Sequence, residues 1–94
     1  MKLFISGPVT NVKNYKRKFR RIERKMTARG YQVLNPAILP SWMEHEDAMH
    51  ICYGMIDVAD AVLFTDGWMN SNGCRLEHDY STAAKKNILY GEPK

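Results

Sequence analysis

Glu77 is the residue whose type and setting best suit covalent chemistry. It falls about one turn into a helix expected to begin at Ser71 or Asn72 and to end near Lys86. We expect it at the border of that helix's apolar face, which we assign to Leu76, Tyr80, Ala83 and Ala84. A partly desolvated carboxylate there suits a nucleophile or a general base. An ordinary acid favoured by the helix dipole is the alternative.

Asp66 and Trp68 follow directly on an apolar run and are further candidates. Asp66 comes two residues after Phe64, at the end of a predicted strand, where a carboxylate can assist catalysis or bind a sugar. A turn with Gly67 explains it equally well. Trp68 and Tyr15 could each stack on a base, although a packed aromatic ring is the commoner case.

Two groups of residues end predicted strands and bear on ligand binding. Ser6, Gly7 and Pro8 close the first apolar run, and Asn35 with Pro36 closes the second. In an open parallel sheet, ligands bind beyond the carboxyl ends of the strands. Gly7 permits close backbone approach, and helix N-termini there favour an anion such as phosphate. Plain turn formation is the alternative interpretation.

The elements that position these residues alternate along the chain. Strands are expected over residues 2–6, 31–34, 61–64 and 87–90, and helices over 12–29, 41–59 and 71–86. Ser41 and Glu44 have the spacing of a capping box, which predicts the start of the second helix. We expect residues 91–94 to form a frayed tail. The alternation predicts an α/β fold with a short parallel sheet covered by helices on both faces.

Composition limits the class of protein. The 94 residues are 45% apolar and 26% charged, which is typical of one folded domain, here residues 1–94. No apolar run is long enough for a membrane span or a signal sequence, so we expect no membrane partner and a cytoplasmic location. We expect Cys52 and Cys74 to be free thiols, because their spacing matches neither a disulfide framework nor a zinc site. The histidines also lack metal-ligand spacing, so neither a metal nor another cofactor is expected. A domain this small would gain stability by pairing with a second copy.

Positive charge is concentrated in the first predicted helix. Residues 13–29 hold nine of the fourteen basic side chains and one acid, Glu23, for a net charge of +8. A solvated outer face is the plain interpretation of this stretch. Docking of nucleic acid on Arg17, Arg20 and Arg21 is the alternative, although no aromatic residue interleaves with that face and no nucleic-acid motif is present.

Four segments together resemble a known family. They are the stretch from Phe4 to Thr10, the Gly-Tyr-x-Val-x-Asn-Pro-Ala stretch of residues 30–37, Ala-Asp-Ala-Val at 59–62, and Gly-Trp-x-x-Ser-x-Gly-x-x-Leu-Glu at 67–77. Their order and spacing resemble the DUF4406 family of bacteria and their phages over almost the whole chain. That family looks like a compact branch of the nucleoside 2-deoxyribosyltransferase superfamily, which includes deoxynucleoside 5′-monophosphate N-glycosidases.

The resemblance implies both a fold and an activity. The fold is three-layered, with a Rossmann-like or flavodoxin-like parallel sheet of about four strands. Glu77 matches the superfamily's nucleophilic glutamate, which attacks the anomeric carbon of a deoxyribosyl group before water or a second base resolves the intermediate. Ser71 and Gly73 match the turn that binds phosphate or sugar, and Ser6 and Gly7 match the loop facing the nucleotide. Superfamily members commonly form dimers or larger assemblies.

One position departs from the superfamily pattern. Cys52 stands where an aspartate usually assists at the sugar or base, and Asp57 lies nearer the third predicted strand. The expectation is therefore an N-glycosidase or deoxyribosyltransferase acting on a deoxynucleoside or its 5′-monophosphate. A nucleotide-binding module without turnover is the alternative.

Overall fold

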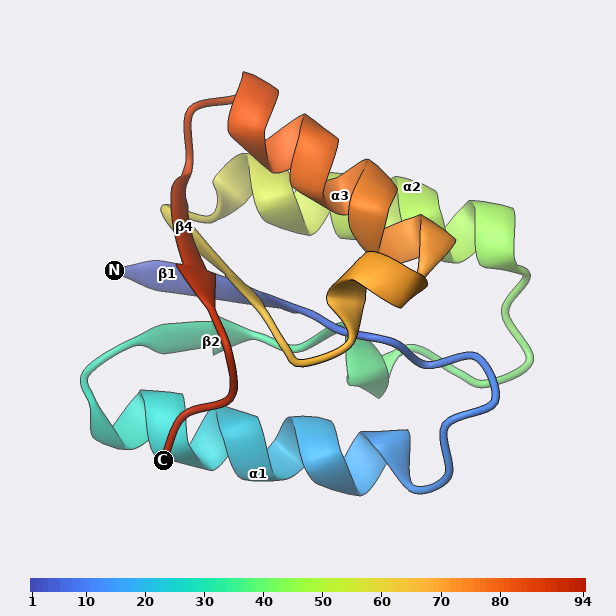
Figure 1. Ribbon diagram of the computed structural model, residues 1–94, viewed down its shortest axis with the longest axis horizontal. Coiled ribbons are helices and arrows are strands. Elements are labelled where there is room, and N and C mark those ends of the chain that lie inside the picture. The colour runs from blue at the N-terminus through green and yellow to red at the C-terminus, as the bar shows by residue number, and fades with distance from the viewer.

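A four-stranded parallel sheet forms the centre of the computed structural model, which describes residues 1–94 (Figure 1). The strands are β1 (Lys2–Ser6), β2 (Gln32–Leu34), β3 (Ala61–Phe64) and β4 (Asn87–Tyr90), in the spatial order β2-β1-β3-β4. Three helices connect them: α1 (Tyr15–Ala28), α2 (His45–Val58) and α3 (Asn72–Ala83). Two short 3₁₀ turns, η1 (Pro36–Ile38) and η2 (Trp68–Asn70), precede α2 and α3. The predicted fold class is confirmed.

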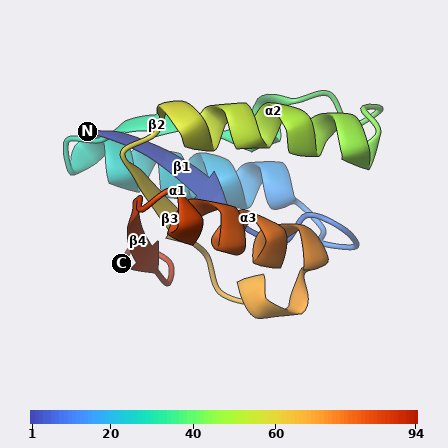
Figure 2. The same cartoon turned by 90° about the horizontal axis from the view of Figure 1, so that it is seen from above.

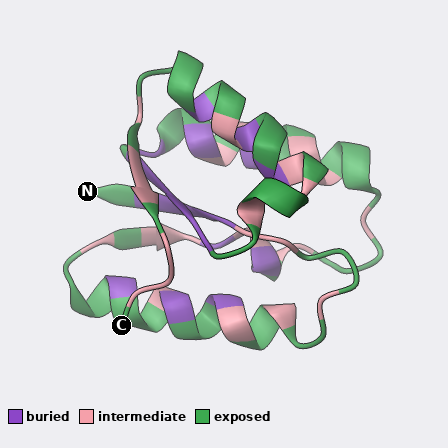
Figure 3. Cartoon of the chain, in the orientation of Figure 1, coloured by how far each residue is buried: buried purple, intermediate pink, exposed green.

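The helices cover both faces of the sheet and so make three layers. Helix α1 lies on one face, and α2 and α3 lie side by side on the other (Figures 1 and 2). Alternate residues of β1 serve the two layers, because Leu3 and Ile5 pack with α1 whereas Phe4 packs with α2. The two inner strands are almost wholly buried (Figure 3). Their continuous apolar runs follow from this burial on both faces.

Helix α1 is amphipathic, and its apolar stripe faces the sheet. Phe19, Ile22 and Met26 are buried, in the predicted steps of three and four residues. The helix begins at Tyr15 rather than at Val12 because Asn11 and Asn14 adopt left-handed backbone conformations, which interrupt a helix.

The predicted capping box at the start of α2 is wrong. The chain makes a separate turn after Pro40, closed by a hydrogen bond from the Met43 N–H to the Pro40 carbonyl. The helix therefore starts at His45, and Glu44 at its N-cap makes no side-chain capping bond. The turn leaves Trp42 81% exposed.

The buried face of α3 also differs from the prediction. Leu76 and Tyr80 are exposed, and the buried residues are Cys74, Glu77 and Ser81. This stripe has the ordinary helical spacing but carries polar side chains, so a search for apolar residues misses it. The helix ends at Ala83 rather than near Lys86, because Lys85 takes a left-handed conformation.

Residues 91–94 are not frayed. The tail crosses the edge of the sheet to α1, where Lys25 Nζ and Arg29 Nη2 donate to the carbonyls of Pro93 and Lys94. The Glu92 carboxylate lies 3.5 Å from Lys18 Nζ. The positive charge of α1 holds the tail in place. No helix of the protein is long and apolar enough to cross a membrane.

Candidate functional site

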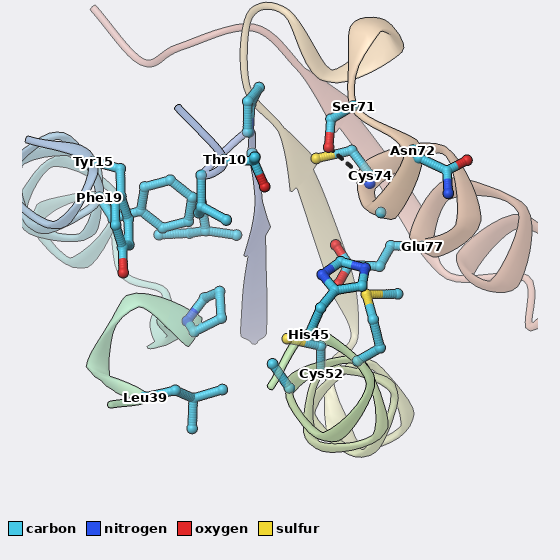
Figure 4. Close-up of a pocket in the computed structure, with 18 of the residues that line it drawn as sticks. Thr10, Tyr15, Phe19, Leu39, His45, Cys52, Ser71, Asn72, Cys74 and Glu77 are labelled. Atoms are coloured by element: carbon cyan, nitrogen blue, oxygen red, sulfur yellow. Dashed lines mark hydrogen bonds between the residues drawn. The ribbon is translucent and has the colours of Figure 1, made fainter. Parts of the chain in front are cut away.

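A pocket of about 790 Å³ opens beyond the carboxyl ends of β1 and β3. The loop after β1 forms one wall, and the N-terminal halves of α2 and α3 form another (Figure 4). Tyr15 and Phe19 of α1 supply an aromatic wall opposite Glu77. Its size falls within the range of small-molecule sites. The pocket lies at the sheet edge that the topology favours for a ligand.

Glu77 is the acidic group of this pocket and is almost completely buried. Its side chain is 6% exposed. The hydroxyl of Ser6, at the last residue of β1, donates a hydrogen bond of 2.6 Å to Glu77 Oε1. Burial raises the pKa of Glu77 to about 6, while the Ser6 hydroxyl and the Cys52 thiol act in the opposite direction. The carboxylate is thus desolvated yet ionised at neutral pH, as a nucleophile requires.

Two cysteine thiols stand near this carboxylate. Cys52 of α2 and Cys74 of α3 are both buried and both line the pocket. Burial, followed by the nearby Glu77 charge, raises the pKa of Cys52 to about 12. Burial also raises the pKa of Cys74. At neutral pH both groups are neutral thiols, so Cys52 does not supply a second negative charge beside Glu77.

The N-terminus of α3 forms the part of the pocket where the sequence predicts phosphate or sugar binding. Ser71 is the N-cap, and its Oγ accepts a bond from the Cys74 N–H at 3.3 Å. At Gly73, an added Cβ would lie 3.4 Å from His45 Cε1 and 3.6 Å from Met49 Sδ. These are ordinary van der Waals distances, so packing within the chain does not by itself require glycine at this position.

The first loop also contributes to the pocket, but Gly7 has a structural reason of its own. Gly7 and Pro8 both line the cavity. A Cβ at Gly7 would overlap the Thr65 hydroxyl and approach Phe19 Cζ to 3.1 Å. Glycine is thus required by packing within the chain, whether or not a ligand approaches this loop.

Four of the candidate residues lie outside the pocket lining. Ser6 is buried and is connected to the pocket by its hydrogen bond to Glu77. Asp66 is exposed in the turn after β3. Trp68 stacks on the His78 imidazole, with ring centroids 4.4 Å apart, and belongs to an aromatic cluster on another part of the surface. Asn35 is buried and makes structural bonds, because its Oδ1 accepts from the Ala37 N–H and its Nδ2 donates to Glu23. Its neighbour Pro36 lines the pocket instead.

His45 is a pocket residue that the sequence reasoning missed. As the first residue of α2 it reaches the wall beside Gly73 (Figure 4). Helical spacing could have found it, because His45 precedes Met49 by four residues and Cys52 by seven and so shares their face of α2. Nowhere in the structure do three or more His, Cys, Asp or Glu side chains group so that they could hold a metal ion.

Comparisons with known proteins bear on this arrangement. A family model described as "Domain of unknown function (DUF4406)" matches residues 1–90. No curated protein matches by sequence. Among the solved structures that match is a 2-desoxiribosyltransferase from Leishmania mexicana, with a TM-score of 0.75 and 20% sequence identity. The match covers 95% of this chain and 62% of that one, so the present chain spans less than two thirds of its length. At this identity the likeness shows a shared fold.

Proposed function

The chain belongs to the DUF4406 family, and we propose that it cleaves the base–sugar bond of a deoxynucleoside or a deoxynucleoside 5′-monophosphate, with Glu77 as the nucleophile. One observation carries the proposal: a buried carboxylate, hydrogen-bonded by Ser6 at 2.6 Å, stands in the wall of a pocket that fits a small molecule. The fold shared with a deoxyribosyltransferase supports the same class of substrate.

The proposed reaction has two steps. In the first, a Glu77 oxygen bonds to the anomeric carbon as the carbon–nitrogen bond to the base breaks, and the bonding pair leaves with the base. In the second, water attacks the same carbon, the ester bond to Glu77 breaks, and the carboxylate is regenerated. The proton that the water loses balances the proton that the departing base takes up. A second base in place of water gives transfer rather than hydrolysis. In both steps the negative carboxylate stabilises the developing positive charge on the sugar.

The neighbouring groups have supporting roles in this proposal. The Ser6 hydroxyl fixes the orientation of the Glu77 carboxylate and helps to keep it ionised. Ser71 and Gly73, at the N-terminus of α3, bind the sugar or a 5′-phosphate with the first backbone N–H groups of the helix. The aromatic wall of Tyr15 and Phe19 faces the base. His45 offers the pocket an imidazole that can donate or accept a hydrogen bond.

A nucleotide-binding module without turnover is the second candidate, and Cys52 favours it. The thiol occupies the position where the resemblance expects an aspartate, and with a pKa raised to about 12 it stays protonated. This candidate predicts a ligand that binds in the pocket and is not cleaved. In both candidates we propose that the 94 residues act as one domain and that two or more copies associate.

Incubation with a panel of deoxynucleosides and their 5′-monophosphates tests the proposal, with released base measured by liquid chromatography. Wild type should release base, and Glu77→Gln should not. Glu46→Gln, which removes an exposed acid from the first turn of α2, is the matched control and should keep full activity. Intact-mass spectrometry should detect a deoxyribosyl adduct on the wild-type chain. Ligand binding without any base release would reject the glycosidase in favour of the binding module.

A further inference from the structure

The outermost ridge of α1 carries three arginines with no partner in the protein. Arg17, Arg20 and Arg24 are exposed, and no hydrogen bond or ion pair engages any of their side chains. At about 100° per residue they fall within roughly 60° of one another on the helical wheel. The buried residues Phe19 and Ile22 lie on the opposite side. The three guanidinium groups therefore line up on the side of the helix farthest from the sheet.

The remaining charged groups of α1 are committed to holding the helix in place. On the flank near the tail, Lys18 and Arg21 pair with Glu92 at 3.5 and 3.9 Å. On the other flank, Lys16 donates to the Leu39 carbonyl, and the acid Glu23 accepts from Asn35. The charged residues on the two flanks thus have structural roles. The three arginines of the ridge have no such role within the protein.

From this ridge we infer that α1 binds the phosphate backbone of a nucleic acid. Guanidinium groups pair with phosphate oxygens in a bidentate manner, and arginine is the residue of choice for this contact. Arg20 and Arg24 are also like charges four residues apart, which weakens an isolated helix, so an anionic partner would relieve repulsion along the ridge. Helix α1 packs on the sheet through its opposite side, so the ridge is the part of the helix that can lie along a phosphate backbone.

The same geometry argues against a lipid surface as the partner. A helix that lies on a membrane inserts an apolar face beside its basic one. The apolar residues Phe19, Ile22 and Met26 are at most 3% exposed, because they pack against the sheet. The ridge therefore offers charge without an apolar face to insert. The inference is independent of the chemistry proposed at Glu77.

Fluorescence anisotropy with a short labelled DNA duplex tests the inference over a range of salt concentrations. Wild-type protein should bind, and three phosphate contacts give a slope of about 3 for log Kd against log salt concentration. The triple variant Arg17→Gln, Arg20→Gln, Arg24→Gln should bind at least about tenfold more weakly and lose most of that slope. Circular dichroism checks that α1 remains folded.

A variant that removes equal charge elsewhere is the matched control. Lys2→Gln, Lys85→Gln and Lys86→Gln lie outside α1 and should leave both the affinity and the salt slope near those of wild type. Replacing the three arginines by lysine should retain binding and reduce its affinity, because the charge stays and the bidentate contact goes. The inference would be overturned if the control variant with Lys2, Lys85 and Lys86 replaced by glutamine bound the duplex as weakly as the arginine-to-glutamine variant. It would also be overturned if the arginine-to-glutamine substitutions left duplex binding unchanged. Displacement of the duplex by polyglutamate at equal charge concentration would instead assign the ridge to an acidic protein.

Discussion

Ser6 on β1 and Glu77 on α3 are 71 positions apart in sequence and joined by a hydrogen bond of 2.6 Å. The bond links the carboxyl end of an inner strand to the second turn of a helix on the neighbouring layer. It gives the buried carboxylate a fixed direction and offsets part of its desolvation.

Ser6→Ala should raise the pKa of Glu77 above its present value of about 6, because the carboxylate loses its hydrogen-bond donor. The acid limb of the pH profile of base release should move to higher pH, with the largest loss of activity near pH 6. Where turnover is slow, the ¹³C signal of the Glu77 carboxyl reports the same titration. Ser81→Ala is the control, because Ser81 is buried on the same helix and its hydroxyl has no partner. An acid limb that stays in place in Ser6→Ala would mean that the bond does not tune Glu77.

The stability of the fold should fall as pH rises from about 4.5 to about 6. The folded state holds the Glu77 proton more tightly than the unfolded state, whose pKa is near 4.5, so it binds more protons in this window. From well below pH 4.5 to well above pH 6, the free energy of unfolding should therefore drop by ~2 kcal/mol in total relative to a chain without this group. Urea unfolding of wild type and Glu77→Gln at several pH values measures the difference. Parallel pH curves for the two proteins would contradict it.

Gly7→Ala should destabilise the protein by about 1 to 3 kcal/mol, as overpacking of a tight interior site does. The new methyl group would overlap the Thr65 hydroxyl and press on the Phe19 ring. Gly54→Ala provides a glycine control inside α2, where an added Cβ meets open space. It should stabilise by about 0.5 to 1 kcal/mol. Thermal unfolding of both variants checks the pair, and equal effects would refute the packing account of Gly7.

Tyr15→Ala should weaken the binding of a nucleoside or nucleotide by about tenfold, the usual order for losing one aromatic contact. Tyr15 lines the pocket and packs edge-on against Phe19, with centroids 6.3 Å apart. Trp68→Phe should leave the affinity unchanged, because Trp68 packs with Phe64 and His78 outside the pocket. Isothermal titration calorimetry compares the two. If only Trp68→Phe weakened the binding, the side chain that stacks on the base would be Trp68 rather than Tyr15.

The layers of this fold are predictable because they depend on simple patterns. The apolar run of β3 indicates a strand that is buried on both faces. The apolar stripe through Phe19 and Ile22 indicates which side of α1 faces the sheet. Gly30, with φ of 96°, ends α1 as its position suggests. These signals are local, so a single sequence carries them.

The site is less predictable because it depends on contacts between distant segments. Glu77 is placed in the interior by a stripe that includes Ser81, and polar residues in such a stripe resemble an exposed face. The turn at Pro40 shifts the start of α2 to His45, which a capping-box pattern cannot anticipate. The resemblance singles out Glu77 and Ser6 separately, and the structure shows that the two side chains are hydrogen-bonded to each other.

The strand order β2-β1-β3-β4 has a consequence for how the chain folds. β1 and β2, with α1 between them, form a crossover unit whose strands pair directly and whose residues have all been made by residue 34. The other edge of β1 pairs with β3, which begins only at Ala61, so that pairing closes a long loop and is slow relative to the first. Ser6 therefore acquires its carboxylate partner only after the second half of the chain has docked. During synthesis on the ribosome, the contact between Ser6 and Glu77 would be among the last parts of the molecule to assemble.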